Sequence, residues 1–226
     1  TCTATFPQRR RRRPRIMNPS TQPTSSPFRD DRPSEECGVV AVSSPSGEET
    51  AQLAFFGLFA LQHRGQEAAG IAVSDGQRAR IHKDVGLLSQ IFTPETLAPL
   101  TGYQAIGHTR YSTMGASTAR NAQPFLVETM HGPLALAHNG SLVNATELRS
   151  QLLQRGFALT AASDTEVMAL MLAAASGRTW EERLERTMPS WKGAYSLVLL
   201  GIDSFIAARD PWGFRPLSIG RTPEGG

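Results

Sequence analysis

Short apolar runs alternate with polar turns along most of this chain, and their lengths predict β-strands more often than helices. Runs of four to seven residues without helical spacing are typical of buried or half-buried strands. They occur at residues 38–42, 70–73, 79–83, 104–109, 134–137, 194–200 and 204–207. The Ser-Asp-Gly sequence at 74–76 is a turn signal, so the second and third runs are predicted to form a hairpin. The last two runs form another hairpin-like pair.

Helical spacing of apolar residues occurs in the segments between these strands. Residues 49–62 repeat apolar side chains at intervals of three and four, at Leu53, Phe56, Ala60 and Leu61. Asn144 followed by Glu147 resembles a capping box at the start of another helix. Ser163 or Asp164 can cap a further helix, one face of which carries Val167, Leu170, Met171 and Ala174.

Strands and helices come in blocks instead of strict alternation, which favours a layered α+β domain over a doubly wound parallel sheet. The 226 residues suffice for one good-sized domain or two small ones. No apolar run approaches the roughly 18 residues that a membrane-spanning helix needs.

Charge separates the first 36 residues from the rest. They hold eight basic and four acidic residues, whereas the whole chain holds 23 basic and 20 acidic, so residues 37–226 carry 15 basic and 16 acidic residues. The near-neutral remainder does not predict a basic surface for nucleic acid or membranes. The arginine-rich stretch at 9–15 predicts a disordered tail, of which residues 1–16 precede the first methionine, Met17. A nucleic-acid-binding tail is the alternative.

The two cysteines differ in setting. Cys2 lies in the tail, while Cys37 stands where the tail ends and the first strand begins. A single thiol in the folded part fits a reducing, cytoplasmic compartment without disulfides, and it is either a nucleophile or a buried structural residue. The five histidines show no metal-ligand spacing, so we expect no metal site in this chain.

Cys37 becomes a self-sufficient nucleophile if it is the first residue of a processed chain. An α-amine has a pKa of about 7.7–8.0 and a thiol one of about 8.5, so the amine can act as the base near neutral pH. This chemistry requires removal of residues 1–36 by cleavage between Glu36 and Cys37. The thiolate would then attack an amide or ester carbonyl.

Other polar residues offer partners for such a reaction. Asn139 and Gly140, placed directly after the strand at 134–137, could stabilise an oxyanion or form an ordinary Asn-Gly turn. Arg110 could bind a carboxylate or form a structural ion pair, and Asp164 could bind an ammonium or cap a helix. Together with the thiol, these groups suit a free amino acid with a side-chain amide, such as glutamine.

Several long motifs resemble the class II glutamine amidotransferases. They occupy residues 37–40, 61–71, 107–113, 123–125, 138–140, 163–166, 209–211 and 214–217. The block at 61–71, Leu-Gln-His-Arg-Gly-Gln-Glu-Ala-Ala-Gly-Ile, is the most specific of them. The residues in these motifs are most similar to the amidophosphoribosyltransferase branch of the family. Glucosamine-6-phosphate synthase and related enzymes are the alternative.

This resemblance implies the N-terminal nucleophile (Ntn) hydrolase fold, a four-layer αββα sandwich, over residues 37–226. It implies that Cys37 is the nucleophile, that Asn139 and Gly140 form the oxyanion hole, and that Arg110, Thr113 and Asp164 bind glutamine. The leader would be cleaved autocatalytically. Ammonia would pass to phosphoribosyl pyrophosphate in a second domain of a homo-oligomeric enzyme. Mg²⁺ and a 4Fe-4S cluster are implied for that second domain and no cofactor for this chain.

Overall fold

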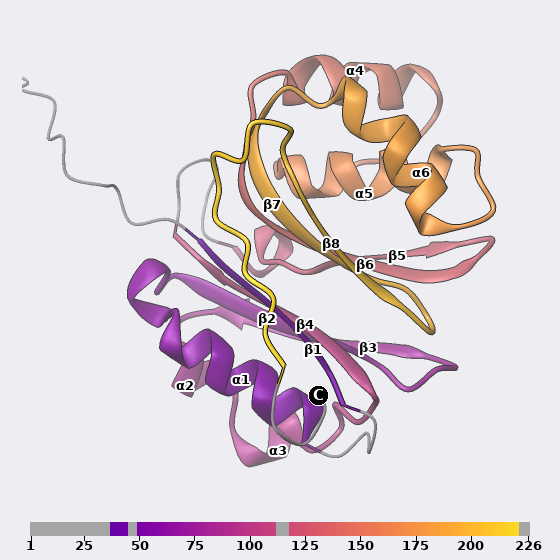
Figure 1. Cartoon of the computed structure of the whole chain (residues 1–226). Coiled ribbons are helices and arrows are strands. Elements are labelled where there is room, and N and C mark those ends of the chain that lie inside the picture. Colours follow the sequence, from indigo (N-terminus) through magenta and orange to yellow (C-terminus); the bar gives the residue numbers. More distant parts are fainter. Residues whose placement is uncertain (1–36, 45–48, 112–117, 222–226) are drawn as a thin grey trace, which may run out of the picture. The chain divides into compact units, whose positions relative to one another are not determined.

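The computed structural model of this chain describes residues 37–44, 49–111 and 118–221 (Figure 1). Three predictions therefore lie outside the described residues: the disordered leader at 1–36 with its arginine-rich stretch, the cleavage site before Cys37, and the role of Thr113.

Two four-stranded antiparallel sheets form the centre of the described chain. The first sheet has the strand order β1-β4-β2-β3, and its strands are β1 (Gly38–Ser43), β2 (Ala68–Ser74), β3 (Ala79–Val85) and β4 (Gln104–Arg110). The second has the order β5-β6-β7-β8, with β5 (Phe125–Thr129), β6 (Gly132–Leu142), β7 (Gly193–Leu200) and β8 (Phe205–Arg209). The two predicted hairpins are confirmed as the pairs β2–β3 and β7–β8.

Helices cover the outer face of each sheet (Figure 1). The first sheet carries α1 (Thr50–Ala60), α2 (Leu88–Ile91) and α3 (Pro94–Leu97), and the second carries α4 (Ala145–Gln154), α5 (Asp164–Ala174) and α6 (Trp180–Thr187). Short 3₁₀ helices lie at Gln62–Arg64, Ala119–Asn121 and Met188–Ser190. The predicted four-layer αββα sandwich is confirmed.

Small aliphatic side chains fill the layer between the two sheets. Its buried members are Ala72, Ile106, Ala135, Ala137, Val198 and Leu200. Because side chains alternate between the faces of a strand, Val39 and Ala41 of β1 also face this layer. The sequence motifs at the strand ends therefore meet across a thin apolar layer.

Helix α1 confirms the predicted helix but buries a different face. The apolar stripe that indicated it is largely exposed, with Leu53 at 41% and Phe56 at 64% exposure, whereas Ala51, Ala54 and Leu58 are buried. A Cβ atom on Gly57 would lie 2.8 Å from Val40 Cγ2. The helix thus packs so closely on the sheet that only small residues fit on much of its inner face.

The strand predicted at 134–137 continues through Leu142 as β6. His138, Asn139 and Gly140 are therefore part of a central strand, paired with β7, which excludes the alternative of an ordinary Asn-Gly turn. Gly140 has φ +143, and a Cβ atom there would lie 2.0 Å from the Ala194 carbonyl oxygen of β7. Glycine is required because the neighbouring strand approaches so closely.

Asn144 takes the N-cap position of α4, but its side chain does not form the predicted capping box. Its Nδ2 donates to the Ser190 carbonyl at 3.0 Å, and its Oδ1 accepts from the Lys192 amide at 3.0 Å. The side chain therefore ties the start of α4 to the segment that enters β7.

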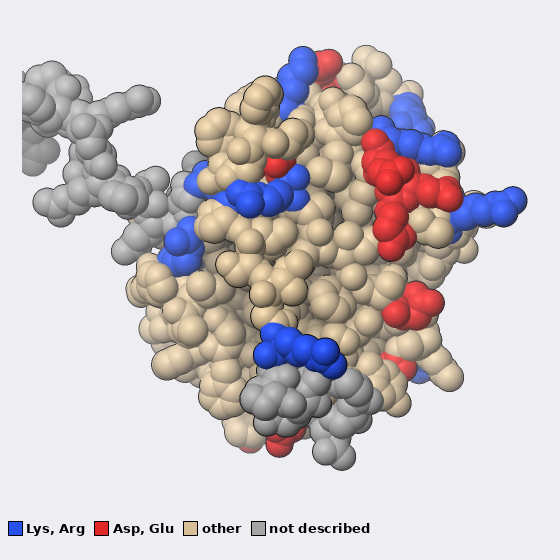
Figure 2. All heavy atoms as spheres, viewed as in Figure 1, with Lys and Arg blue, Asp and Glu red and all other residues tan. Residues whose placement is uncertain are grey.

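Basic side chains of the described residues stand in separate groups on the face shown in Figure 2. Among these residues, the structure contains no helix that is both long enough and apolar enough to span a membrane.

Candidate active site

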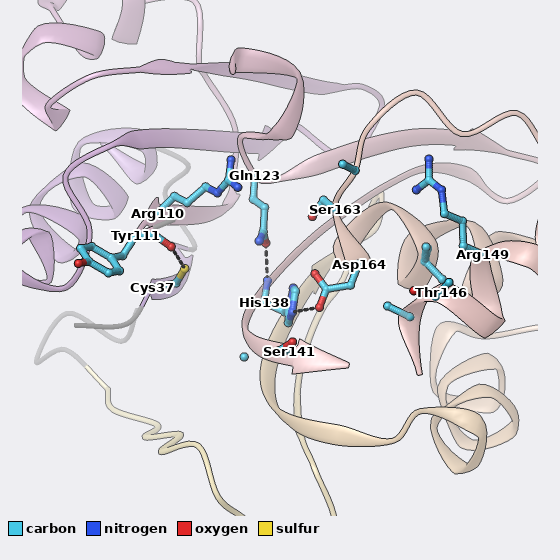
Figure 3. A pocket seen from close by; sticks show the side chains of 14 residues that line it. Cys37, Arg110, Tyr111, Gln123, His138, Ser141, Thr146, Arg149, Ser163 and Asp164 are labelled. Carbon is cyan, nitrogen blue, oxygen red and sulfur yellow. Dashed lines mark hydrogen bonds and ion pairs between the residues drawn. The ribbon is translucent and has the colours of Figure 1, made fainter. Parts of the chain in front are cut away.

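A pocket of about 110 Å³ opens where the ends of both sheets meet the N-terminus of α5 (Figure 3). It draws side chains from residues that are up to 130 positions apart in sequence. Its lining residues are Cys37, Arg110, Tyr111, Gln123, His138, Gly140, Ser141, Ala145, Thr146, Arg149, Ala162, Ser163, Asp164 and Val167. Four of the six predicted site residues, Cys37, Arg110, Gly140 and Asp164, are among them.

Cys37 precedes β1 and continues the alternation of Val39 and Ala41, so its side chain faces the layer between the sheets. Its Sγ lies 3.7 Å from the Tyr111 carbonyl oxygen. Burial raises the pKa of the Cys37 thiol, while the Arg110 guanidinium acts in the opposite direction. The uncharged thiol is therefore the resting form, and attack on a carbonyl requires a base.

The long motif at 61–71 holds the ends of β1 and β4 together beside this thiol. Arg64 Nε donates to the Cys37 carbonyl at 3.4 Å, and Thr109 Oγ1 donates to the Gly65 carbonyl at 2.5 Å. A Cβ atom on Gly65 would lie 2.6 Å from the Arg110 backbone carbon. Through these contacts, the backbone of the motif packs closely against the end of β4 and fixes Cys37 and Arg110 relative to each other.

Arg110 is the last residue of β4 and is only 7% exposed. Figure 3 shows its side chain on the Cys37 side of the pocket. His108 lies two residues earlier on the same face of β4 and is fully buried. Burial, together with His138 and Arg110, lowers the pKa of His108 to about 3, so this histidine is neutral at physiological pH.

On β6, Gly140 lines the pocket. Asn139 is not among the lining residues, and its side chain is buried, with 5% exposure. Asn139 follows Ala135 and Ala137 in the strand alternation, so its side chain faces the layer between the sheets, as that of Cys37 does. Asn139 and Cys37 thus approach this layer from opposite sheets.

Asp164 is the first residue of α5, and Ser163 is the N-cap, whose hydroxyl accepts from the Thr165 amide at 3.2 Å. The Asp164 Oδ2 accepts from the Leu142 amide at 3.0 Å and lies 3.5 Å from His138 Nε2. Burial acts to raise the pKa of the Asp164 carboxyl, but His138 and the Leu142 amide outweigh burial and lower that pKa. Asp164 is therefore an ionised carboxylate in the pocket wall.

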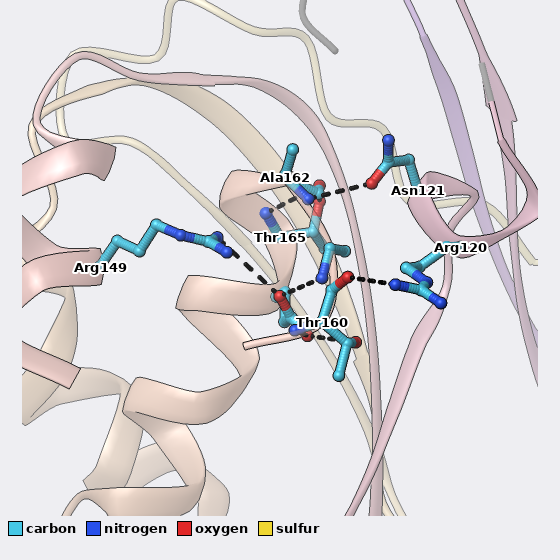
Figure 4. A network of polar contacts seen from close by, with 9 residues as sticks. Arg120, Asn121, Arg149, Thr160, Ala162 and Thr165 are labelled. Carbon is cyan, nitrogen blue, oxygen red and sulfur yellow. Dashed lines mark hydrogen bonds and ion pairs between the residues drawn. The ribbon is translucent and has the colours of Figure 1, made fainter. Parts of the chain in front are cut away.

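The turn that leads into α5 is held by buried polar contacts (Figure 4). Glu166 is 5% exposed, and its Oε1 accepts from both the amide and the hydroxyl of Thr160 at 2.8 Å. Its Oε2 accepts from the Ala161 amide at 2.9 Å, and Asn121 Oδ1 accepts from the Ala162 amide at 3.0 Å. These contacts fix the position from which Asp164 projects.

Gln123, His138 and Tyr111 line the pocket without having been predicted as site residues, although each lies in or beside a motif quoted above. The Gln123 Oε1 accepts from the His138 amide at 2.7 Å. Lys83 holds the Gln123 loop, since its Nζ donates to the Ala122 carbonyl at 2.6 Å and the Pro124 carbonyl at 3.1 Å. Burial lowers the pKa of Lys83 to about 8. The spacing of these residues in the sequence does not predict such contacts, because the contacts join segments that are far apart along the chain.

Within the described residues, no group of three or more His, Cys, Asp or Glu side chains is placed to hold a metal ion. The resemblance implies Mg²⁺ and a 4Fe-4S cluster only for a second domain, and no chemical step is assigned to either.

The sequence and the fold of this chain are both similar to those of known glutamine amidotransferases. Residues 108–226 match the family described as "Glutamine amidotransferase domain". An amidophosphoribosyltransferase of Synechococcus elongatus is 52% identical over 200 residues, which cover 88% of this chain and 40% of that protein. One of Methanocaldococcus jannaschii is 47% identical over 187 residues, which cover 82% and 40%.

Two solved structures share the fold. One, described as the allosteric regulatory enzyme of purine biosynthesis, has a TM-score of 0.76 and 41% identity over 81% of this chain and 39% of its own. The other is the glutamine phosphoribosylpyrophosphate amidotransferase from B. subtilis complexed with ADP and GMP. It has a TM-score of 0.73 and 39% identity over 83% of this chain and 40% of its own. The chain thus spans about 40% of the length of these relatives, and it belongs to the glutamine amidotransferase domain family.

Proposed function

We propose that this chain is a glutaminase domain that hydrolyses the side-chain amide of glutamine and supplies ammonia. One observation carries the proposal: a thiol, a buried guanidinium, an ionised carboxylate and a strand glycine line the same pocket. These groups match the chemical features of free glutamine. Arg110 suits its α-carboxylate, Asp164 suits its α-ammonium, and Cys37 lies in the same pocket to meet the amide.

The proposed reaction begins when the free α-amine of a processed Cys37 takes the proton from Sγ. The thiolate forms a bond to the amide carbon, and the C=O electrons move to oxygen. The Asn139 side-chain amide and the Gly140 N–H are the proposed donors to that oxyanion. Collapse of the intermediate breaks the C–N bond, and the departing nitrogen takes a proton from the ammonium to leave as ammonia. Water then hydrolyses the thioester to release glutamate.

The raised pKa of Cys37 supports the need for this base. Burial keeps the proton on sulfur, and among the described residues no histidine is hydrogen-bonded to Sγ. An α-amine at the same residue is within reach, directly or through one water. Thr113, which the family resemblance also assigns to glutamine binding, remains part of the proposal.

Relatives named amidophosphoribosyltransferase suggest the fate of the ammonia. We infer that the domain serves a reaction in which phosphoribosyl pyrophosphate and ammonia give 5-phosphoribosylamine, catalysed outside the described residues. That step is separable from glutamine hydrolysis.

The test compares two forms of the protein, one that begins at Cys37 and one that retains residues 1–36 in an uncleavable form. We expect release of equal amounts of glutamate and ammonia from L-glutamine by the first form only. A third form that begins with alanine at position 37 (Cys37→Ala) is the control and should be inactive. Full activity in the form that retains the leader would contradict the proposed base, whereas no glutamate release from any form would contradict the function itself.

A further inference from the structure

The Asp164 carboxylate is anchored to β6 by one of its oxygens. Both contacts that it makes with this strand use Oδ2. The Leu142 amide donates to it at 3.0 Å, and His138 Nε2 lies 3.5 Å from it, the second contact being drawn in Figure 3. The second distance is longer than a good hydrogen bond but short enough for a strong electrostatic contact. Oδ1 takes part in neither of these two contacts with β6.

His138 is 2% exposed, and it is held from its other ring nitrogen. Its Nδ1 lies 2.9 Å from the hydroxyl of Thr165, which is fully buried. The Ser163 hydroxyl lies 2.9 Å from that of Thr165 and accepts from the Thr165 amide. A continuous chain of polar groups therefore runs from Ser163 through Thr165 and His138 to Asp164.

The negative charge of Asp164 sets the direction of the protons along this chain. A lone pair of Nε2 facing a carboxylate would be repelled, so Nε2 carries the proton. The Ser163 hydroxyl donates to the Thr165 hydroxyl, so the Thr165 proton is left to point at Nδ1 of His138. The Thr165 hydroxyl must therefore donate to His138 and accept from Ser163. Thr165 thus selects both the tautomer and the ring orientation of His138.

We propose that Thr165 and His138 are positioning residues for recognition of the α-amino group of the substrate. They hold an N–H against Oδ2 of Asp164, which keeps the half-buried carboxylate ionised and turned toward the pocket. The inference rests on the proposed function. It adds a role for two residues that do not contact the reacting amide: His138 contacts Asp164, and Thr165 contacts His138. The lowered pKa of Asp164 agrees with this arrangement.

The test uses Thr165→Val, which removes the hydroxyl while nearly conserving shape, and two substrates. L-Glutamine carries an α-ammonium, and glutaramate has the same carboxylate and amide without it. We expect kcat/KM for L-glutamine to fall by about tenfold, mainly through KM, because a charge-assisted contact is misaligned. The value for glutaramate should stay within about twofold of wild type, since its binding does not use Asp164.

Rescue and control variants separate this role from a general structural one. Thr165→Ser keeps the hydroxyl and should restore most of the activity with glutamine. Thr187→Val removes another buried hydroxyl, which donates to the Arg183 carbonyl at 2.6 Å in α6, and should leave the ratio of the two substrates unchanged. Ser163→Ala removes the first donor of the chain, and it should show the same selectivity if Thr165→Val does not fold.

Equal losses with both substrates, or no loss with glutamine, would overturn the inference while leaving glutamine hydrolysis by the wild-type protein intact. Failure of the wild-type protein to hydrolyse glutamine would instead overturn the proposed function, and this inference with it.

Discussion

A thiol in a largely buried pocket reacts only when a base takes its proton and a nearby positive charge makes the thiolate tolerable. Cys37 has such a charge in Arg110, which opposes the effect of burial on the thiol pKa. In the proposed function Arg110 has a second task, because a guanidinium presents two parallel donors to a carboxylate. Both tasks need the charge, but only the second needs the planar fork.

Arg110→Lys separates these two tasks. A lysine keeps the charge but replaces the fork with a point charge, so we expect KM for glutamine to rise by about tenfold with a smaller change in kcat. Steady-state glutaminase kinetics would measure this change. Arg80→Lys is the matched control, since Arg80 pairs with Asp75 in an exposed turn and should not alter KM. An unchanged KM in Arg110→Lys would refute the carboxylate role.

Gly140→Ala tests the close approach of β6 and β7. The new Cβ would meet the Ala194 carbonyl oxygen at 2.0 Å and the Tyr195 Cα at 2.7 Å. We expect a loss of about 3 kcal/mol or more in the free energy of unfolding, together with loss of glutaminase activity. Gly76→Ala is the control, because Gly76 also has positive φ but has open space around its Cβ position. Its cost should be about 1–2 kcal/mol, measured by urea denaturation.

At the scale of elements, hydrophobic spacing predicts where strands and helices form better than which face they bury. The strands β1, β2, β3, β4, β7 and β8 begin and end close to their predicted limits. Helix α1 is predicted, yet it buries Ala51, Ala54 and Leu58 instead of the predicted apolar stripe. Packing distance determines that face, and packing distance cannot be read from one segment alone.

Elements with weak apolar patterns were not predicted. Helix α6 has the sequence Trp-Glu-Glu-Arg-Leu-Glu-Arg-Thr, which contains too few apolar residues to show a helical pattern. Its Arg183 side chain is buried and donates hydrogen bonds to the Leu172 and Ala173 carbonyls. Strand β6 extends past its apolar part, where His138 has buried polar partners: its Nδ1 lies 2.9 Å from the Thr165 hydroxyl, and its amide donates to Gln123 Oε1. Likewise, Asn144 has a typical capping pattern but bonds to residues far along the chain.

The β2–β3 hairpin allows a direct test of charge. Asp75 accepts from the Arg78 and Gln77 amides and from Arg80, and these contacts lower its pKa to about 2. The folded pKa is thus below the ordinary value, so the stabilisation is fully present above about pH 4 and is lost as pH falls through about 2.

Carboxyl NMR titration would measure this pKa directly. Arg80→Met should raise the Asp75 pKa only partly, since the larger backbone contributions from Arg78 and Gln77 remain. A titration of Asp75 at the ordinary value in the unaltered protein would show that the turn does not hold the carboxylate as described.

The whole described domain matters for the site because the two halves of the pocket belong to different sheets. Cys37 directly precedes β1 and Arg110 ends β4 of the first sheet, while Gly140 lies in β6 of the second sheet and Asp164 begins α5, which packs on it. Among the described residues, no single strand or helix spans both halves of the pocket, so the spacing of the sheets sets the distance between the thiol and the ammonium site. The alanines of the intervening layer keep that spacing short.

Ala137→Val tests this dependence. Ala137 lies between the sheets two residues before Asn139, and a larger side chain there should separate the sheets at a cost of about 1–3 kcal/mol. We expect glutaminase kcat/KM to fall by about tenfold or more, because misplacement of reacting groups by about 1 Å has large effects on rate.

Leu172→Val is the matched control, since Leu172 is equally buried but lies between α5 and the outer face of the second sheet. It should lose about 1 kcal/mol of stability and little activity. Urea denaturation and glutaminase assays at a temperature where both variants are folded would compare them. Because both variants are folded at that temperature, a larger loss of activity in Ala137→Val must come from the position of the sheets. Equal activities would mean that the pocket tolerates a change in sheet spacing, and its geometry would then have to be set locally at the strand ends.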